Sequence, residues 1–515
     1  MGWIKSGDRT LSGAEFHQRA LRAAGALEAL GVRKGDGVAL YLRNELAYFE
    51  AAFGVGMLGA YSIPVNWHYT ADEAGYLLRD SEVGVLLIHA DLLGPVASAI
   101  PENVTVVVVE TPPEVLAAYD IAPLAPPPGA LIWRELVEQA QPLAREPEIA
   151  PSSIIYTSGT TGRPKGVRRP QPTPEQVAAT NAMLGWSYGY TDHLAGKKPM
   201  DSITTAVIGP VYHAAPNAHS AFSIRMGANV IVTPRFSPEG LLRLIEKERV
   251  THLNMVPIMF KRLLQLPDEV KRKYDLSSLQ YVTHAAAPCP PEVKRAMIEW
   301  WGPVIWEYYG STEMGNVTNI SSQEWLEHPG SVGRVMPGVR VRVIDGHGND
   351  MPPYGVGEVI GGPETGVNFT YQNAPEKRKE MERFGLVAPG DVGYFDADGY
   401  LYLCDRKNDM IISGGANIYP AEIEAELLKL PGVADAAVFG IPDEEFGESV
   451  MAVVQPAPGA QLSADGLRAA LRRTLTGYKV PRRIDFADSL PREDSGKIFK
   501  RKLREPFWAG RDRRI

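Results

Sequence analysis

The N-terminal part of the chain alternates between helical and strand-like patterns of apolar residues. Residues 14–30 place apolar side chains at helical spacing, and residues 38–42 (VALYL) are a short, continuously apolar segment. A second helix is predicted over 47–58, and Val-rich strands are predicted over 83–88 and 104–109. Continuous apolar strands separated by amphipathic helices are typical of parallel sheets that helices cover.

Beyond residue 332 the strands become shorter and turns interrupt them. Residues 345–349 (DGHGN) predict a hairpin turn, because Gly and Asn tolerate the backbone angles of tight hairpins. The alternation of helix and strand then resumes, with helices predicted over 420–430 and 464–475 and a strand over 434–439. The C-terminal part therefore predicts a separate folding unit.

We predict an α/β fold with two domains, because a chain of 515 residues is too long for one hydrophobic core. The large N-terminal domain, residues 1–405, is expected to contain helix-covered β-sheets and a small β-rich subdomain over about 332–403. The smaller C-terminal domain, residues 406–515, is expected to be a mobile α+β unit.

Composition and charge exclude several classes of protein. The net charge of −8 argues against a broad nucleic-acid-binding surface. Cys289 and Cys404 are too few for a disulfide framework or a four-cysteine metal site. No apolar run reaches the roughly 18 residues of a membrane span, and residues 1–6 lack the apolar part of a signal peptide. We expect a soluble cytoplasmic protein without a nucleic-acid partner or a transmembrane segment.

A loop rich in Gly, Ser and Thr, residues 156–167 (YTSGTTGRPKGV), carries the strongest chemical signal. Its glycines let the main chain approach an anion closely, while hydroxyls and a lysine supply donors and charge. The spacing does not fit the Walker A pattern, which requires Gly-Lys-Ser/Thr four residues after the first glycine. The residues predicted to contact phosphate are Thr157, Ser158, Gly159, Thr160, Thr161, Gly162 and Lys165.

This loop resembles the signature of the adenylate-forming (AMP-binding) superfamily, which includes acyl-CoA synthetases, firefly luciferase and the adenylation domains of peptide synthetases. Four further family motifs follow in the same order. In residues 309–313 (YGSTE), the resemblance implies that Tyr309 stacks on adenine, Thr312 meets the α-phosphate and Glu313 binds Mg²⁺. The nucleotide site would also include Gly310, Ser311, Ala286, Ala287 and Pro288.

The later motifs imply the ribose contacts, the hinge and the catalytic lysine. Asp391 matches the family's aspartate that accepts hydrogen bonds from both ribose hydroxyls, and Arg406 matches a residue that makes a second contact to ribose or phosphate. Asn408 falls at the hinge about which the C-terminal domain swings, where aspartate or lysine is usual. Lys497, in the string PREDSGK, matches the lysine that bridges the attacking carboxylate and the nucleotide. The catalytic residues implied are Lys497, Glu313, Thr160 and His213.

The same resemblance implies where the acid and the thiol bind. His213 matches a residue that closes over the substrate carboxylate, and Gly414 with Gly415 would leave room for a narrow pantetheine arm. Tyr478 and Lys479 resemble residues that meet the nucleotide of coenzyme A. The predicted acyl pocket consists of His213, Ala214, Ala215, Asn217, His284, Ala285 and Val317.

The resemblance implies ATP-dependent conversion of an acid to acyl-AMP with release of pyrophosphate, then transfer to coenzyme A with release of AMP. ATP, Mg²⁺ and coenzyme A are the small molecules implied. Small residues at 214, 215 and 218, with no fixed charge over 213–217, favour an apolar and bulky acid.

Some alternatives stay open. An amide-bond synthetase, which gives the adenylate to an amine, would share every first-step motif. A non-catalytic nucleotide- or acyl-binding protein is disfavoured, because Lys165, Glu313, Asp391 and Lys497 are all present. A peptide-synthetase domain would need a carboxylate near 213–217 to hold an amino group, and none occurs there. The particular acid, the oligomeric state (a homodimer included) and control by acetylation of Lys497 are not fixed by the sequence.

Overall fold

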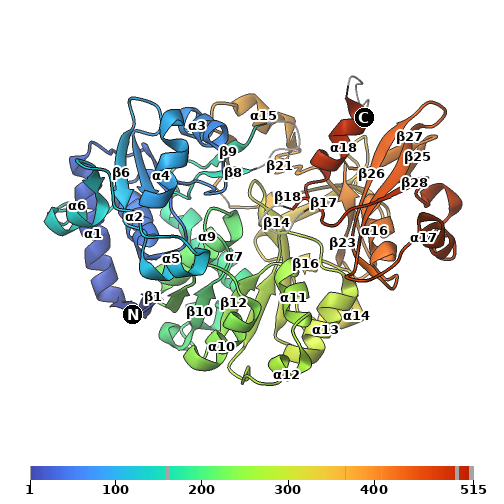
Figure 1. Ribbon diagram of the computed structural model, residues 1–515, viewed down its shortest axis with the longest axis horizontal. Helices are drawn as coiled ribbons and strands as arrows, with labels where there is room; N and C mark the ends of the chain where they lie inside the picture. Colours follow the sequence, from blue (N-terminus) through green and yellow to red (C-terminus); the bar gives the residue numbers. More distant parts are fainter. Residues whose placement is uncertain (1, 158–162, 366, 408, 493–497, 510–515) are drawn as a thin grey trace.

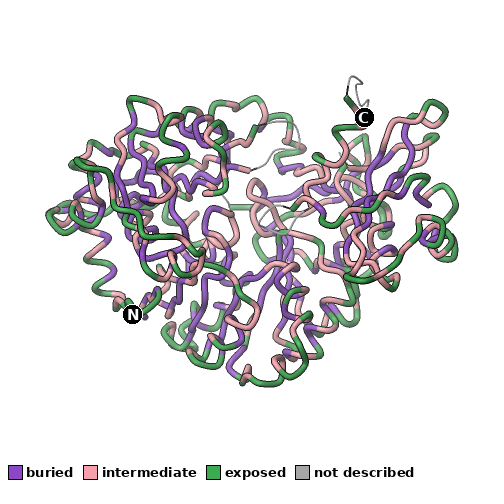
Figure 2. Tube along the Cα trace, in the orientation of Figure 1, coloured by how far each residue is buried: buried purple, intermediate pink, exposed green. Residues whose placement is uncertain are grey.

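The computed structural model describes residues 2–157, 163–365, 367–407, 409–492 and 498–509. Figure 1 shows the N-terminal sheets and helices on one side of the molecule and the C-terminal elements, orange to red, on the other. Within the described residues, no helix is both long enough and apolar enough to cross a lipid bilayer. The apolar side chains instead gather between the sheets and their helices, where the buried segments of Figure 2 lie.

The first sheet confirms the predicted alternation of strand and helix. Its five strands are all parallel, in the order β4-β3-β5-β6-β7. Helix α1 (Gly13–Ala29) begins at Ser12, where Ser12 and Glu15 each accept a hydrogen bond from the other's main-chain N–H. This capping box satisfies two of the donors that a helix start leaves free. The strands are β3 (Gly37–Tyr41), β4 (Tyr61–Pro64), β5 (Val85–His89), β6 (Thr105–Val109) and β7 (Leu131–Ile132), and the further helices are α2 (Leu46–Met57), α3 (Ala71–Asp80), α4 (Ala90–Val96), α5 (Pro113–Tyr119) and α6 (Trp133–Gln139).

The second sheet has nine strands, in the order β16-β15-β14-β13-β12-β10-β11-β1-β2. Its central strands are parallel, and antiparallel pairs close both edges. The strands are β1 (Trp3–Ser6), β2 (Arg9–Ser12), β10 (Thr204–Val207), β11 (Asn229–Val232), β12 (His252–Met255), β13 (Tyr281–His284), β14 (Ile305–Ser311), β15 (Gly315–Ile320) and β16 (Arg334–Val335). Because ligands of open parallel sheets bind beyond the carboxyl ends of the strands, the segments after β13 and β14 are well placed for a site.

The helices of this second region flank the sheet and include the two that matter most below, α7 and α9. Leu242, Phe260 and Met297 from three of the other helices pack into one core against it. The helices are α7 (Pro174–Tyr188), α8 (Thr191–Leu194), α9 (Ala214–Met226), α10 (Pro238–Glu248), α11 (Pro257–Leu264), α12 (Asp268–Lys271), α13 (Pro291–Trp301) and α14 (Ser322–Glu327).

The β-rich segment predicted after residue 332 forms an antiparallel sheet, in the order β20-β21-β18-β22-β23 with β17 paired to β18. The predicted turn at 345–349 is present, because Gly348 N–H donates to Asp345 O at 3.1 Å and Gly348 has φ 87°. The elements are β17 (Val339–Ile344), β18 (Gly357–Pro363), α15 (Pro375–Glu380), β20 (Glu382–Arg383), β21 (Leu386–Val387), β22 (Asp391–Phe395) and β23 (Leu401–Arg406).

The C-terminal elements build their own sheet and core, in the order β25-β24-β27-β26 with β28 beside β27. The strand predicted over 434–439 is longer than expected, because its pairing with β27 continues to Asp443. The helix predicted over 464–475 ends at Leu471, ahead of a turn. The division of the chain at residue 406 stays a prediction. The elements are β24 (Ile411–Ser413), β25 (Ala416–Ile418), α16 (Pro420–Leu428), β26 (Val433–Asp443), β27 (Gly447–Pro456), α17 (Ala464–Leu471), β28 (Arg483–Phe486) and α18 (Lys500–Trp508).

Candidate active site

The Gly/Ser/Thr-rich segment begins at the end of strand β8 (Ile155–Thr157) and returns as strand β9 (Lys165–Arg168). These strands are antiparallel, and Thr157 is the register partner of Lys165. Both residues line a large cavity of about 1700 Å³. The two ends of the predicted phosphate loop therefore meet at the wall of one cavity. The predicted phosphate contacts Ser158, Gly159, Thr160, Thr161 and Gly162 lie outside the described residues.

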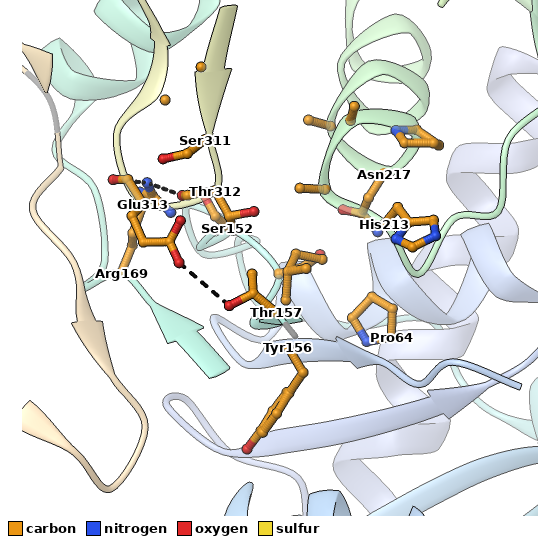
Figure 3. A pocket seen from close by; sticks show the side chains of 18 of the residues that line it. Pro64, Ser152, Tyr156, Thr157, Arg169, His213, Asn217, Ser311, Thr312 and Glu313 are labelled. Carbon is orange, nitrogen blue, oxygen red and sulfur yellow. Dashed lines mark hydrogen bonds between the residues drawn. The ribbon is translucent and has the colours of Figure 1, made fainter. Parts of the chain in front are cut away.

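Glu313 follows strand β14 and points its carboxylate toward Thr157 (Figure 3). Thr157 Oγ1 lies 3.5 Å from Glu313 Oε1, and the Tyr371 hydroxyl donates to the same oxygen at 3.0 Å. Tyr371 belongs to β19 (Thr370–Tyr371), which pairs with β9. Burial, together with the Glu313 charge, raises the pKa of Tyr371, so this phenol stays a proton donor. Glu313 thus presents a carboxylate, with a hydroxyl beside it, to the cavity.

The turn after β14 is held by a partly buried side chain that directly follows strand β9. Arg169 donates from Nη2 to the main-chain oxygens of Thr312 and Glu313, at 2.8 and 3.1 Å. Gly310, Ser311 and Thr312 all border the cavity. A Cβ at Gly310 would lie 2.1 Å from Gly315 O across the strand pair, so only glycine fits there. This close approach brings the turn residues into position beside the cavity.

The segment after β13 also turns at the cavity. Ala285 and Ala286 line it, and Ala287 and Pro288 continue the same turn. Ala286 has φ 73°, in the left-handed region that alanine rarely adopts. Such backbone strain persists only where the surrounding structure imposes it. The residues around this turn therefore hold Ala286 in its left-handed conformation. The small side chains of the turn leave the main chain open to a flat ligand.

Tyr309, Asp391 and Arg406 form one network of contacts. Asp391 begins β22 opposite Arg406, which ends β23. The Tyr309 hydroxyl donates to Asp391 Oδ2 at 2.5 Å, and Arg406 Nε lies 3.3 Å from Asp391 Oδ1. Burial and the Asp391 charge raise the pKa of Tyr309 well above its ordinary value. Arg406 borders the cavity, while Tyr309 and Asp391 lie buried behind it.

Asp391→Asn is expected to raise the KM for ATP by about tenfold to a hundredfold, with little change in kcat. Hydrogen bonds to a charged group contribute roughly 1.5–3 kcal/mol, and the variant removes the charge while keeping the side-chain shape. Steady-state pyrophosphate release measured against ATP concentration checks this. Asp398→Asn makes the same change at an exposed turn of this sheet and should leave the KM unaltered. An unchanged KM in Asp391→Asn would remove Asp391 from the nucleotide site.

Helix α9 forms the opposite wall of the cavity (Figure 3). His213 is its N-cap residue and borders the cavity together with Ala214 and Ala215. Asn217 also borders the cavity, but its amide already donates to the Tyr48 hydroxyl at 2.7 Å and to Val211 O at 3.0 Å. This amide fixes the start of α9 against α2. The predicted acid-binding residues of this helix therefore lie together, facing the Glu313 side.

Two residues predicted for the acyl pocket lie elsewhere. The His284 side chain is fully buried in the core, with Nε2 3.6 Å from Glu307 Oε2. Successive side chains of a strand point to opposite faces, so His284 points away from the cavity that Ala285 reaches. Val317 is fully buried among the side chains of the β-rich region, and Asn316 occupies the cavity wall instead. Neither residue borders the cavity in this arrangement, and their role in the acyl pocket stays a prediction.

The C-terminal region contributes a further wall of the cavity. Arg492, Phe499 and Lys502 all line it, although the sequence analysis singled out none of them. Arg492 and Ile498 form an isolated β-bridge, and Phe499 N–H donates to Pro491 O at 2.8 Å. The chain segments on both sides of the predicted catalytic lysine are therefore held at the cavity. Lys497 and the predicted hinge residue Asn408 lie outside the described residues.

The residues predicted to meet coenzyme A are not part of this cavity among the described residues. Gly414 and Gly415 form the two-residue turn between β24 and β25, with φ values of 57° and 82°. Such angles at both turn positions are those of a tight hairpin and favour glycine by themselves. Tyr478 is exposed, and Lys479 Nζ forms an ion pair with Glu422 at 2.7 Å. A thiol role for these residues therefore requires the C-terminal region to move.

The cavity also contains residues that motif matching missed. Tyr371, which donates to Glu313, comes from a strand without any recognised motif. Arg225 lies on α9, four positions after Ala221, and lines the cavity. Helical spacing from Ala214 and Ala218 would have found Arg225, because positions three or four apart share a helix face.

Comparison with known proteins gives this arrangement a context. Residues 3–366 match the family model described as AMP-binding enzyme, and residues 422–497 match that of the AMP-binding enzyme C-terminal domain. The fatty acid–[acyl-carrier-protein] ligase ScoC of Streptomyces coeruleorubidus is 34% identical, covering 98% of this chain and 93% of its own. The feruloyl-CoA synthase of an Amycolatopsis species is also 34% identical, covering 98% and 95%.

A solved structure resembles the whole chain as well. The amide bond synthetase McbA from Marinactinospora thermotolerans superimposes with a TM-score of 0.83 at 27% identity, covering 98% of this chain and 96% of its own. Transfer to a thiol and transfer to an amine are therefore both represented among similar proteins.

Proposed function

Because the chain belongs to the AMP-binding enzyme family, we propose that it is an AMP-forming acid–thiol ligase that uses ATP to join a carboxylic acid to coenzyme A. The observation that supports this most directly is a single cavity bordered by three groups of residues. Thr157, Lys165 and Glu313 border it on one side, the start of α9 on another, and Phe499 and Lys502 on a third. A nucleotide, an acid and the C-terminal region can thus meet in one place.

In the first step, a carboxylate oxygen of the acid attacks the α-phosphorus of ATP. The new O–P bond forms as the bond to the pyrophosphate oxygen breaks, and pyrophosphate leaves with that electron pair. Both partners are anionic, so catalysis rests on positioning and on neutralising charge. Lys165, which borders the cavity, and Lys497 would supply positive charge, while Arg406 at the cavity wall and Asp391, paired with it, would hold the nucleoside. No general base is required, because an ordinary carboxylic acid is already ionised at neutral pH.

Glu313 is suited to hold Mg²⁺. Its carboxylate and the Thr157 hydroxyl are hard oxygen donors at the cavity wall, which is the ligand type that Mg²⁺ prefers. When bound, the ion neutralises charge on the phosphate oxygens. Tyr371 holds one oxygen of Glu313 through its hydroxyl, which orients the carboxylate.

In the second step, the thiolate of coenzyme A attacks the acyl carbon. The C–S bond forms, the acyl–phosphate bond breaks, AMP leaves, and the thiol proton passes to solvent. Gly414 and Gly415 lie away from the cavity, whereas Arg492 and Phe499 border it. We therefore propose that this arrangement serves the first step, and that a swing at Asn408 brings the glycine turn to the adenylate for the second.

The body of the acid is proposed to be apolar and bulky. Ala214, Ala218 and Ala221 form a row of small side chains on α9, and Phe53 and Leu184 border the same cavity. Removal of an apolar substrate from water contributes roughly 0.8 kcal/mol per methylene, so a short acid such as acetate should bind poorly.

A panel of acids assayed for pyrophosphate release, with and without coenzyme A, tests this function. The proposed ligase should release pyrophosphate with ATP and acid, and should turn over repeatedly only when the thiol is present. A parallel arm with a small amine examines the second candidate, which the similarity to an amide bond synthetase favours. Amide formation without thioester formation would replace the proposed acceptor, and no pyrophosphate release with any acid would reject the function.

Ala218→Trp should depress kcat/KM for an aryl or polycyclic acid by at least about tenfold while sparing a short acid. Ala218 faces the cavity midway along α9, so an indole there fills the space that a bulky acid needs. Competition assays between one bulky and one short acid measure the change in preference. Ala182→Trp, on an exposed face of α7, is the matched control. An unaltered preference in Ala218→Trp would place the acid elsewhere.

A further inference from the structure

Arg225 is a cationic side chain of the cavity that the proposed reaction does not use. Arg225 lines the cavity from the last turn of α9. Ala214, Ala218, Ala221 and Arg225 follow one another at spacings of four, three and four, so they share one helix face. The face therefore consists of small apolar side chains that lead from His213 to a guanidinium.

Arg225 has no acidic partner in the part of the chain that the structure describes. Its guanidinium makes no ion pair or hydrogen bond there, and desolvation lowers its pKa without a neighbouring carboxylate to oppose the shift. Yet its surface is exposed rather than covered by packed atoms. The Arg225 side chain is thus accessible but poorly solvated, as expected of a side chain that projects into a large cavity.

The other arginines at this cavity differ in this respect. Arg169 donates to two main-chain oxygens, and Arg406 is paired with Asp391. Arg225 is also not needed to cap α9, because Gly227 N–H donates to Ile224 O and Ala228 N–H donates to Ser223 O. A poorly solvated cation without a partner is costly, and an arginine keeps its charge under all ordinary conditions.

We propose that Arg225 binds an oxygen acceptor, a carboxylate or a ketone, at the far end of the acid substrate. This inference rests on the proposed function, because it assumes that the reacting carboxylate lies beside His213. The eleven positions from Ala214 to Arg225 correspond to roughly 16 Å of helix, at 1.5 Å per residue. The substrate class is then an elongated acid with an apolar body and a polar terminus, and Arg225 determines specificity.

Three matched series of straight-chain acids test this, one ending in a methyl group, one in a second carboxylate and one carrying a ketone near its end. Initial rates of pyrophosphate release give kcat/KM for each acid, and calorimetry measures binding in the absence of ATP. At the best chain length, the native enzyme should prefer an oxygen-ended acid over the methyl-ended one by at least about tenfold. The carboxylate and ketone series show which acceptor is preferred.

Arg225→Met should abolish this preference, Arg225→Gln should retain part of it for the ketone, and Arg225→Lys part of it for the carboxylate. Arg272→Met removes an exposed arginine of similar charge outside the cavity and should leave the preference unchanged.

Equal losses for all acids in Arg225→Met would show a structural role and overturn the inference. The inference would also be overturned by a different pair of results. The native enzyme would prefer methyl-ended acids at every chain length, and Arg225→Met would bind all three series as the native protein does. Failure of every acid to release pyrophosphate is a different result, because it rejects the proposed function itself.

Discussion

Replacing Lys497 with alanine is expected to slow acyl-adenylate formation by at least about a thousandfold. In the proposed mechanism the attack joins two anions, so removing the cation proposed to bridge them would withdraw the stabilisation of the developing charge. Thioester formation from supplied acyl-adenylate should continue at close to the native rate, because that step requires no such bridge. The two half-reactions are measured separately, by acid-dependent pyrophosphate release and by acyl-CoA formation from synthetic adenylate.

The contrast between the half-reactions is what identifies the role of Lys497. Arg492 and Phe499, on either side of it in the sequence, both border the cavity. Lys429→Ala removes a surface lysine of the same region and should leave both half-reactions unchanged. Equal losses in both half-reactions of Lys497→Ala would mean that the lysine acts only on folding.

Gly415→Leu is expected to suppress acyl-CoA formation by about a hundredfold while sparing acid-dependent pyrophosphate exchange. A leucine on the β24–β25 turn would block the path proposed for the pantetheine arm, and small displacements of reacting groups cost factors of this size. In the present arrangement a Cβ at Gly415 meets no atom within 4 Å. The substitution should therefore cause no steric clash in the conformation that serves the first step. Exchange of labelled pyrophosphate and chromatography of acyl-CoA measure the two steps.

A strained turn alone could also weaken the protein, and Gly459→Leu controls for that. Gly459 has φ 77° and equally open surroundings, against φ 82° at Gly415, so the two substitutions impose a similar backbone cost. Gly459→Leu should preserve both steps. If Gly415→Leu retains full thioester synthesis, the glycine turn does not border the route of the thiol, and transfer to an amine gains support.

The sequence predicted the elements whose pattern is set locally. Helix α1 was predictable because Ser12 and Glu15 mark its start and apolar residues recur at helical spacing. Sheet order was not predictable, since the neighbours β10 and β12 are separated by β11 in the chain and paired only through tertiary packing. Helix α17 ends at Leu471, earlier than predicted, because a turn follows that the spacing of apolar residues does not reveal.

The candidate site shows the same division. The motif residues Thr157, Lys165 and Glu313 all border one cavity. They could be predicted because each belongs to a motif of consecutive residues in the sequence. The sequence did not show that His284 points away from the cavity, because the side that a strand residue faces depends on what packs there, here Glu307 and Lys294. Helical spacing places Arg225 on the same face as Ala214 and Ala218, but the sequence alone did not show that this face borders a cavity.

The carboxylate of Asp391 is already immobilised by Tyr309 and Arg406 before any nucleotide arrives. A carboxylate has about four acceptor positions, so two would remain for the ribose if Asp391 binds it as proposed. ATP, acyl-AMP and AMP carry the same ribose and would be held there equally firmly. A contact that is equally strong with substrate, intermediate and product tightens the binding of all three. It does not accelerate the reaction. If Asp391 has this role, we expect the rate of AMP release to depend on contacts to its phosphate, and accumulating AMP to compete with ATP for the same ribose site.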